Sequence, residues 1–567
     1  MLGTHHRRCR EGAFPVLRVQ NLRPRTCHVC LLMGALVLTM LAAAPVVGRE
    51  VDDAAGRPTV CGGMEPDLAF QAEVHAIGRD HACEHLRGKN WSHAHRASGI
   101  ASSTSEVAAA IEASPAEIGS WSPAINPGTK TIGISAVLLH TGEVLLFGGK
   151  YASTDKNTAA YLYDPRTGAG HEVPAPAAVF CGSVTPLSDG RVLSAGGADP
   201  VPKGIVDLWL FDPVTEQWLR QPDSPLGRYY PTSTRLADGR IVIAAGNELD
   251  GRTKNPTVEV YTPPAPGQTR GTLQVVGPAH VTNFYPIQWL MPDGNVLEVS
   301  ARKSASLNPS VWSWTTHPLL PSPTGQGSAG LMLPGGPQGS TQVMVIGGTI
   351  QSVGQRRTLK YDYANRSAGW SLGTPMPTAR GHMNVVQVPD GSAFAIGGNS
   401  SDLYNQGQLQ TMAYDPRTAT WTNMATQTYR RAYHSTAILL PDGRIMSAGD
   451  TGAGGGRQRI DYYSPPYMFR TRPEITSAPK ELTYGQSFVI ATSGPTATQA
   501  VLMAPSATTH AVEMNARRVP LAVTRTATGL TATAPPSGRV APPGHYMLFT
   551  MTSDGTPSTA SWVHIEN

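Results

Sequence analysis

Seven copies of a unit of about 50 residues run through the middle of this 567-residue chain. Each copy has an apolar segment, a tight turn usually written Asp-Gly, a second apolar segment and a pair of small residues. Asp-Gly between alternating apolar segments is the strongest short-range signal of a β-hairpin. The copies end at intervals of 47 to 55 residues, at Gly149, Gly197, Gly246, Ala301, Gly348, Gly398 and Asp450.

This period, with its paired glycines, is typical of kelch repeats, and seven such units close into a β-propeller. The 59 Gly and 48 Pro residues also disfavour long helices. We therefore predict an all-β protein with a seven-bladed kelch β-propeller over residues 120–472. A solenoid is the alternative, but it would need capping units, and none stands out in the sequence.

The periodicity stops after Arg472-Pro473. Residues 473–567 show short alternating strands broken by Pro and Gly, over about the length of a β-sandwich domain. The sequence thus predicts a C-terminal immunoglobulin-like β-sandwich after the propeller. Residues 49–119 are rich in Ala, Ser and His and indicate only an irregular N-terminal segment.

The first 48 residues are typical of a targeting segment. Six Arg between Arg7 and Arg25 precede an apolar stretch, 31–48, that ends in small residues, as a signal peptide does before its cleavage site. The stretch also reaches the lower length limit of a membrane span, so an uncleaved N-terminal membrane anchor is the alternative. In both cases we expect the bulk of the chain to lie outside the cytosol, either secreted or anchored.

The cysteines divide between this leader and the rest of the chain. Cys9, Cys27 and Cys30 lie in the leader. Cys61 and Cys83 could close a disulfide in an oxidising compartment, which leaves Cys181 as an odd thiol, most simply a buried core residue. Five histidines near Cys83 favour a solvated segment over a metal site, because no ligand spacing repeats: His75, His81, His85, His93 and His95.

The repeat also provides a ruler along each unit. The residue eight positions before a turn Asp is expected at the same position on the innermost strand of each blade, and equivalent positions lie on a ring around the propeller axis. A purely structural core would have Val, Ile or Ala there. The residues found are instead Cys181, Tyr230, Tyr285, His382 and His434. We therefore expect a thiol, two phenols and two imidazoles near one mouth of the channel.

Tyr433 directly precedes His434. Neighbours in a regular strand face opposite ways, so both can reach one ion only where the strand begins or bends. Imidazole and phenolate together suit copper or iron, and copper heads the affinity order for nitrogen-containing sites. Taken alone, a Tyr-His dipeptide is more often ordinary packing than a metal site.

With these residues placed, the chain from about residue 120 to its C-terminus resembles the galactose oxidase and glyoxal oxidase family of copper-radical oxidases. The Arg-Tyr-Tyr-Pro segment is similar to the glyoxal oxidase form. The matching motifs are Phe180-Cys181, Arg228-Tyr229-Tyr230-Pro231, Tyr433-His434-Ser435, Leu440-Pro441-Asp442-Gly443-Arg444, Thr509-His510-Ala511-Val512, Arg517-Arg518-Val519-Pro520-Leu521, Pro542-Pro543-Gly544-His545-Tyr546 and Ala560-Ser561-Trp562-Val563.

The resemblance implies four copper ligands: Tyr230, His434 and His510 in the equatorial plane and Tyr433 in the axial position. It also implies that Cys181 is joined to the ring of Tyr230 by a thioether, so that the partner of the odd thiol is a phenol. His510 belongs to the C-terminal domain, so its loop would have to enter the propeller channel.

The implied reaction oxidises small aldehydes of the glyoxal type, or primary alcohols, with O2 and releases H2O2. Copper accepts one electron, and the thioether-substituted Tyr230 holds the second oxidising equivalent as a radical. Tyr433 acts as the general base for the substrate hydroxyl. We expect a monomer without nucleic-acid partners, since a dispersed net charge of +5 does not indicate them.

The chain departs from the family pattern in several places. Gly182-Ser183 follows Phe180-Cys181 where a small residue and then Gly would be expected. Asn247-Glu248-Leu249 stands where galactose oxidase carries the indole that covers its radical. Other candidates for that cover are Trp289, Trp312 and Trp314.

The missing indole favours glyoxal-type aldehydes over galactose, and nothing in 49–119 matches the family's sugar-binding domain. The alternatives are a galactose or primary alcohol oxidase, and a non-catalytic propeller that binds a glycan or protein. Tyr285 and His382 match no family ligand and favour packing over a substrate-facing role. The Arg517-Arg518 pair favours a structural role over an anion site.

Overall fold

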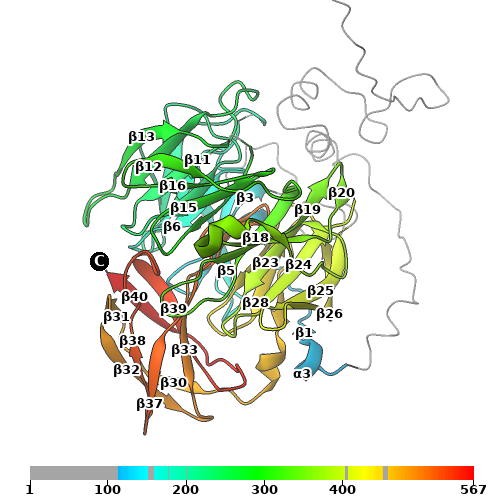
Figure 1. Ribbon diagram of the computed structural model, residues 1–567, viewed down its shortest axis with the longest axis vertical. Helices are drawn as coiled ribbons and strands as arrows, with labels where there is room; N and C mark the ends of the chain where they lie inside the picture. Colours follow the sequence, from blue (N-terminus) through cyan, green and yellow to red (C-terminus); the bar gives the residue numbers. More distant parts are fainter. Residues whose placement is uncertain are drawn as a thin grey trace, which may run out of the picture. The chain divides into compact units, whose positions relative to one another are not determined.

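The computed structural model describes residues 113–566, apart from 151–158, 177, 200, 282, 402–406 and 451–457 (Figure 1). All of them belong to one compact unit, Val60–Asn567. The leader, the proposed Cys61–Cys83 pair and the histidines of 75–95 lie outside the described residues. Within the described part, no helix is long and apolar enough to cross a membrane.

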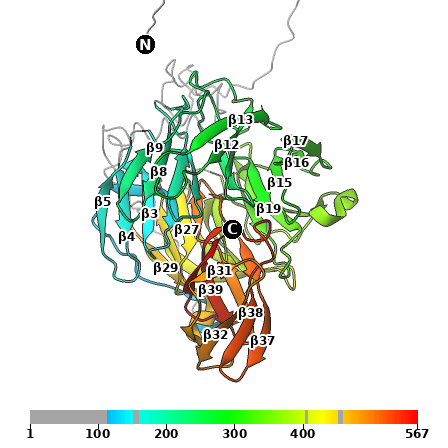
Figure 2. The same cartoon turned by 90° about the vertical axis from the view of Figure 1, so that its left-hand side faces the viewer.

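Seven antiparallel sheets follow one another along the chain, each built around four strands (Figures 1 and 2). Their innermost strands contact one another in a closed cycle, from the first sheet to the seventh and back to the first. The predicted all-β fold with a seven-bladed propeller is thereby confirmed. The first four blades consist of β2 (Thr131–Leu138), β3 (Val144–Lys150), β4 (Ala159–Tyr163) and β5 (Gly170–Pro174); β6 (Ser183–Pro186), β7 (Val192–Ala195), β8 (Leu208–Asp212) and β9 (Gln217–Arg220); β10 (Thr232–Arg235), β11 (Ile241–Ala244), β12 (Thr257–Thr262) and β13 (Thr272–Pro278); and β14 (Ile287–Leu290), β15 (Val296–Ser300), β16 (Lys303–Asn308) and β17 (Ser313–Thr316).

The last blade is completed by a strand from before the first. β1 (Ser120–Trp121) pairs with β29, with Trp121 opposite Tyr463, so the two ends of the propeller share one sheet. The fifth to seventh blades consist of β18 (Gln326–Met332), β19 (Gln342–Ile350), β20 (Val353–Gly354), β21 (Thr358–Asp362) and β22 (Ser371–Leu372); β23 (Gly381–Gln387), β24 (Ala393–Asn399), β25 (Gln408–Asp415) and β26 (Thr420–Arg431); and β27 (Ser435–Leu439), β28 (Ile445–Gly449), β29 (Asp461–Ser464) and β1.

The Asp-Gly turns join the first two strands of these blades for a local reason. Asp189 accepts a hydrogen bond from the backbone amide of Arg191, and Gly190 between them has φ +86°. A short carboxylate that bonds the chain two residues on, followed by a glycine with positive φ, is the chemistry of a tight turn. The same arrangement recurs at Asp238, Asp293, Asp390 and Asp442.

The C-terminal strands form two further sheets that pack around one apolar core, which includes Phe488, Ile490, Leu530 and Leu548. They are the orange and red strands of Figures 1 and 2, and they confirm the predicted sandwich. One sheet contains β30 (Glu474–Ser477), β32 (Ser487–Ser493), β37 (Ala522–Thr526) and β38 (Gly529–Thr533); the other contains β31 (Glu481–Thr483), β33 (Gln499–Met503), β36 (Arg518–Pro520), β39 (Gly544–Met551) and β40 (Ser561–Glu566).

One excursion of the sandwich joins the propeller. β34 (Ala507–Thr509) and β35 (Val512–Glu513) form a small hairpin, and β34 pairs with β2, with Thr509 opposite Ser135. The first blade thus becomes a six-stranded sheet. β34 also contacts β6 and β27, the innermost strands of two other blades, so this hairpin lies among the inner strands.

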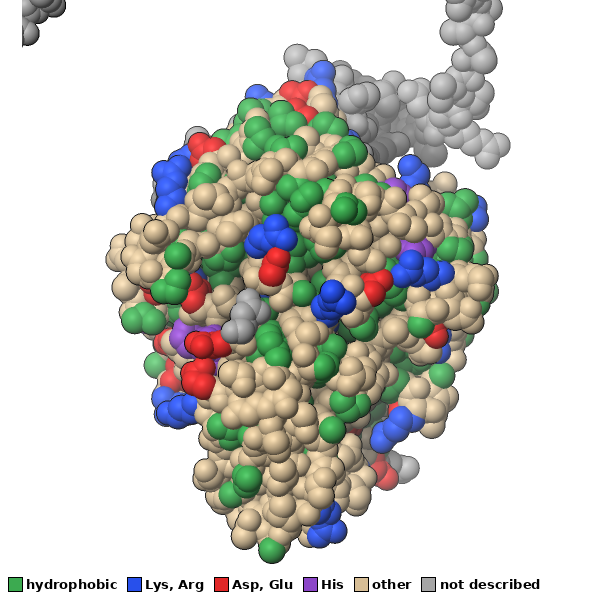
Figure 3. Space-filling model, turned by 60° about the vertical axis from the view of Figure 1, so that its left-hand side comes forward, with side chains coloured by type: hydrophobic (Ala, Val, Ile, Leu, Met, Phe, Trp, Pro, Cys, Tyr) green, Lys and Arg blue, Asp and Glu red, His purple; other side chains and the backbone are tan. Residues whose placement is uncertain are grey.

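Helical structure is confined to three short elements among the described residues: α3 (Pro115–Ile118), which lies in the segment expected to be irregular, η2 (Tyr363–Ala368) and η3 (Pro466–Phe469). On the face in Figure 3, Lys and Arg are scattered among Asp and Glu and do not gather into one basic patch.

Candidate metal centre

The five ring positions found with the sequence ruler share an unusual backbone conformation. Their φ angles lie between +41° and +66°, in the left-handed region that side chains other than Gly rarely adopt. Each such residue costs on the order of 1–3 kcal/mol, and such strain is concentrated at functional sites. The residues are Cys181, Tyr230, Tyr285, His382 and His434.

The ring expectation needs one correction. The sequence placed these residues on the innermost strands, whereas four of the five lie just before their strand begins, at the entry to the blade. His382 is the exception, as the second residue of β23. A left-handed residue at the entry turns the chain sharply, so neighbouring side chains need not alternate between faces.

Buried arginines anchor three of these entries. Arg228, Arg380 and Arg431 each donate a hydrogen bond to the carbonyl oxygen of a residue at or near the end of the blade's second strand, Ala245, Gly397 and Gly449, at 2.8–3.0 Å. Two of them also pair with a buried carboxylate: Arg228 with Glu259 at 3.1 Å and Arg431 with Asp461 at 2.7 Å. These bonds hold the strained segments in place.

The bend expected at the Tyr-His pair is present. His434 has φ +66° and β27 begins one residue later. The rings of Tyr433 and His434 consequently lie 3.7 Å apart between centroids. Both side chains are buried, with at most 3 % of their surface exposed.

His510 stands at the tip of the hairpin that enters the propeller, and His510 and Ala511 both have positive φ. Its Nδ1 lies 2.6 Å from the hydroxyl of Thr509, and that hydroxyl donates to the carbonyl of Ile134 at 3.2 Å. A hydroxyl that gives its proton to Ile134 can accept a hydrogen bond from Nδ1–H of His510, and this is the tautomer that we assign. Nε2 then presents its lone pair, the arrangement of a metal-ligating histidine.

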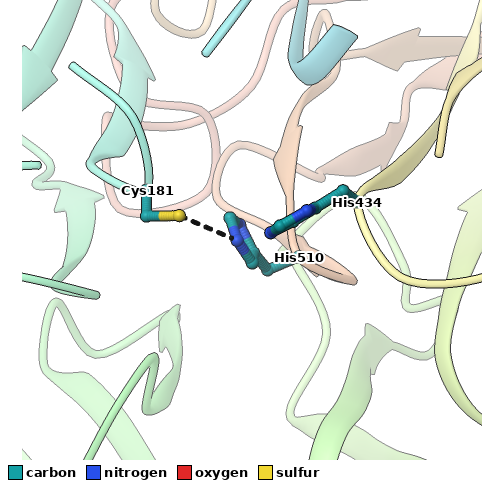
Figure 4. A group of neighbouring side chains, drawn as sticks. All are labelled: Cys181, His434 and His510. Carbon is teal, nitrogen blue, oxygen red and sulfur yellow. Dashed lines mark hydrogen bonds between the residues drawn. The ribbon is translucent and has the colours of Figure 1, made fainter. Parts of the chain in front are cut away.

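The predicted site residues lie close together around the imidazole of His510. The Sγ atom of Cys181 lies 3.3 Å from Nε2 of His510, and one donor atom from each of Cys181, His434 and His510 lies within 4.8 Å of the others (Figure 4). The hydroxyls of Tyr230 and Tyr433 are hydrogen-bonded to each other. Both phenol rings contact the His510 ring, at 4.9 and 5.3 Å between centroids.

The backbone brings Cys181 and Tyr230 together as well, since the amide of Tyr230 donates to the carbonyl of Cys181 at 3.2 Å. The site therefore assembles two imidazoles, two phenols and a thiol from three blades and the C-terminal domain. Soft sulfur, imidazole and phenol donors in one buried place fit a transition metal such as copper.

Aromatic rings that sequence reasoning missed surround Tyr230. Tyr229 stacks on it at 4.0 Å, and Phe284 meets it edge-on at 5.3 Å. The ammonium group of Lys254 lies 3.5 Å from the centre of the Phe284 ring and donates to Asn247 at 2.7 Å. Burial lowers the pKa of Lys254 to about 8. In the sequence, Phe284 could have been noticed only because it directly precedes Tyr285, one of the five residues around the propeller axis.

The three Trp candidates for a cover over Tyr230 lie elsewhere. Trp289 packs in the core between two blades, Trp312 lies under the guanidinium of Arg240, and Trp314 stacks near His280. The Tyr230 ring is covered by Tyr229 and Phe284 where an indole was expected. Lys254 in turn contacts the Phe284 ring.

The two ring residues without a family role also lie at the centre. Tyr285 donates its hydroxyl to the carbonyl of Gly182 at 3.1 Å, and burial raises its pKa. His382 meets Tyr433 edge-on at 4.9 Å, and burial lowers its pKa to about 3. Both line a cavity of about 80 Å³ beside the site, together with Tyr230, Phe284, Ile287, Val299, Ser300, Thr324, Gly325, Gln326, Gly327, Ser328, Tyr433, His510 and Val512.

Charged side chains hold the segment that follows His510 in the sequence. Glu513 accepts the backbone amides of Ala507 and Asn515, and burial raises its pKa to about 7. Arg517 and Arg518 donate to backbone carbonyls, which supports the structural role expected for this pair.

Comparison with known proteins decides the family. The model described as "Glyoxal oxidase N-terminus" matches residues 126–464, and "Galactose oxidase-like, Early set domain" matches 472–565. This chain belongs to the glyoxal oxidase family. The sequence motifs of this chain resemble those of the copper-radical oxidases in this family. The resemblance found from the sequence is therefore confirmed.

Relatives of the family support this placement. A WSC domain-containing protein of Arthroderma benhamiae is 28% identical over 78% of this chain, which spans about half, 53%, of that protein. "Aldehyde oxidase GLOX1" of Arabidopsis thaliana is 26% identical, with 74% of this chain and 77% of that protein covered. A fungal alcohol oxidase solved in complex with copper has the same fold, with a TM-score of 0.69, 22% identity and coverage of 80% of this chain and 100% of that one.

The buried ion pair behind the Tyr433-His434 entry gives a first prediction. Asp461→Ala leaves the Arg431 guanidinium buried without its carboxylate, and we expect a loss of about 3–5 kcal/mol in the free energy of unfolding. The matched control is Arg417→Ala, which removes the exposed pair with Asp415 and should cost less than about 1 kcal/mol. Urea unfolding measures both, and equal losses in the two variants would contradict the anchoring role.

Proposed function

We propose that this chain is a copper-radical oxidase that oxidises small aldehydes with O2 and releases H2O2. The observation that carries the proposal is the meeting of Cys181, Tyr230, Tyr433 and His434 with His510, which comes from a different domain. A propeller that only binds a glycan or protein has no need to bring these five side chains to one buried point.

The donor set fits copper. Tyr230, His434 and His510 would hold the ion together with Tyr433, and a hydrogen bond donated by Nδ1–H of His510 to Thr509 would leave Nε2 free to ligate. When bound, copper would supply a one-electron oxidant and an acidic position that binds the substrate oxygen. Since the oxidation removes two electrons, a second acceptor is required, and Tyr230 is the candidate.

A thioether between Cys181 and Tyr230 would make that second acceptor. Its formation joins Sγ to a ring carbon of the phenol and removes one hydrogen from each partner, and O2 takes both hydrogens and leaves as H2O2. Electron donation by sulfur would stabilise a radical on the ring. The stacked Tyr229 and edge-on Phe284 would shield it from solvent.

Tyr433 is placed to act as the base. Tyr433 lines the cavity and its hydroxyl is hydrogen-bonded to that of Tyr230, so it would accept the proton of a substrate hydroxyl held at the centre. Tyr230 would then take a hydrogen atom from the substrate carbon. Overall, a hydrated aldehyde and O2 give a carboxylic acid and H2O2, and a primary alcohol and O2 give an aldehyde and H2O2.

Two features favour aldehydes over galactose. The cavity is small, and the family model and the relative named aldehyde oxidase are of the glyoxal oxidase type. A primary alcohol or galactose oxidase is the second candidate, supported by the galactose oxidase-like C-terminal model and by a fold neighbour titled alcohol oxidase. A screen of aldehydes and primary alcohols by peroxidase-coupled detection of H2O2 separates the two.

The thioether gives the direct test of the oxidase proposal. After treatment with Cu²⁺ and O2, we expect the intact mass to fall by about 2 Da, because each bond removes two hydrogens. Cys181→Ser should show no such loss, and it should lose nearly all H2O2 production. An unchanged wild-type mass with no peroxide from any substrate would leave the binding propeller as the better account.

The second-shell bond to His510 gives a separate prediction for metal binding. Thr509→Val removes the acceptor for Nδ1–H, and loss of such an outer partner typically costs 10–100-fold in metal affinity. We expect that weakening for Cu²⁺, measured by competition with a chelator. Thr508→Val is the control, since Thr508 bonds Asn384 and Val512 and not His510. An unchanged affinity in Thr509→Val would contradict the role of Thr509.

We also propose that the chain acts outside the cytosol. Basic residues followed by the apolar stretch 31–48 support export, and cleavage would occur near residue 48. N-terminal sequencing of the mature protein distinguishes the outcomes. A start near residue 49 indicates secretion, an intact leader in the membrane fraction indicates an anchor, and an intact leader in the cytosol contradicts export.

A further inference from the structure

We propose that His382 is a substrate-binding residue that bonds the second hydroxyl of a hydrated aldehyde, and that it thereby sets a preference for aldehydes over primary alcohols. This inference rests on the proposed oxidase function. It assigns a role to a residue that belongs neither to the metal ligands nor to the thioether.

The first support is position. His382 is 4 % exposed and lines the same cavity as Tyr230, Tyr433 and His510. Its ring meets the Tyr433 ring at 87°, with 4.9 Å between centroids. The imidazole and the Tyr433 phenol are therefore neighbours in the wall of one cavity.

The second support is that the fold makes room for this side chain. His382 itself has φ +52°, and Gly327 facing it has φ +58°. A Cβ atom on Gly327 would lie 2.4 Å from Nδ1 of His382, so no other residue fits opposite the imidazole. Arg380, two residues earlier, is anchored to the carbonyls of Gly397 and Gln410.

The third support is the chemistry of the cavity wall. Its lining residues include no Lys, Arg, Asp or Glu among the described residues, which suits a neutral substrate. Tyr285 donates to Gly182, and the hydroxyl of Ser328 bonds to Gly325 and Gly347. The wall also contains the neutral polar side chains of Ser300, Thr324 and Gln326. A neutral imidazole has one donor and one acceptor and suits a hydroxyl group.

The substrates differ in the feature that this imidazole would recognise. A hydrated aldehyde carries two hydroxyls on the reacting carbon, and a primary alcohol carries one. With the first hydroxyl at Tyr433, the proposal places the second at His382, whose ring is next to that of Tyr433. A site built to bond a hydroxyl discriminates against analogues that lack it, because its own polar group then loses a partner.

The test compares methylglyoxal with hydroxyacetone, which differ only at the carbon to be oxidised. In His382→Phe, which keeps an aromatic ring against Tyr433, we expect kcat/KM for methylglyoxal to fall 10–100-fold and that for hydroxyacetone to change less than about threefold, since one hydrogen bond to substrate is lost. His382→Asn keeps a polar group and tolerates positive φ, so it should recover part of the preference. Equal losses for both substrates, or no loss, would overturn the assignment.

A binding measurement separates this assignment from the oxidase proposal. Hydrated trifluoroacetone is a diol that has no hydrogen on the diol carbon and cannot be oxidised, and trifluoropropan-2-ol is its single-hydroxyl counterpart. Fluorine NMR titration of the copper-loaded protein should show about tenfold weaker binding of the diol in His382→Phe, with the alcohol unchanged. If wild type makes no peroxide, the oxidase proposal fails; if the diol preference survives in His382→Phe, the role of His382 fails.

Discussion

The structure depends on a strained turn at the entry of several blades. A left-handed residue there directs its side chain to the centre of the channel, where a regular strand would direct alternate residues to opposite faces. The strain is tolerated because buried guanidinium groups bond the carbonyls around it, as Arg228 and Arg431 do with support from Glu259 and Asp461. The same bonds that stabilise the fold therefore position Tyr230, Tyr433 and His434.

The centre is completed by another domain. His510 reaches the channel because β34 adds to the edge of the first blade through backbone hydrogen bonds. Thr509 then orients the imidazole, and Glu513 ties the two ends of the hairpin. Dependence on both domains means that the proposed site can form only after the propeller and the sandwich have folded together.

The wall around Tyr230 is built without the indole that the sequence analysis looked for. Where the sequence lacks the expected indole, Asn247 holds Lys254 over Phe284, and Phe284 packs edge-on against Tyr230. A cation placed behind the ring and a small uncharged cavity beside it would influence both the stability of a phenol radical and the choice of substrate. Of the residues that make this wall, Phe284 and Lys254 were singled out by no repeat or motif.

The seven blades and the ring residues could be predicted from sequence, because turn chemistry and a period near 50 residues are local and recur in each blade. The end of that period predicted the sandwich, and His510 was found only through its motif. The left-handed entries, the packing of Phe284 and Lys254 at Tyr230, and the contact of His382 with Gly327 became visible only in the folded chain. Those features depend on contacts between different blades or distant loops. Such contacts cannot be predicted from the spacing of residues along one strand.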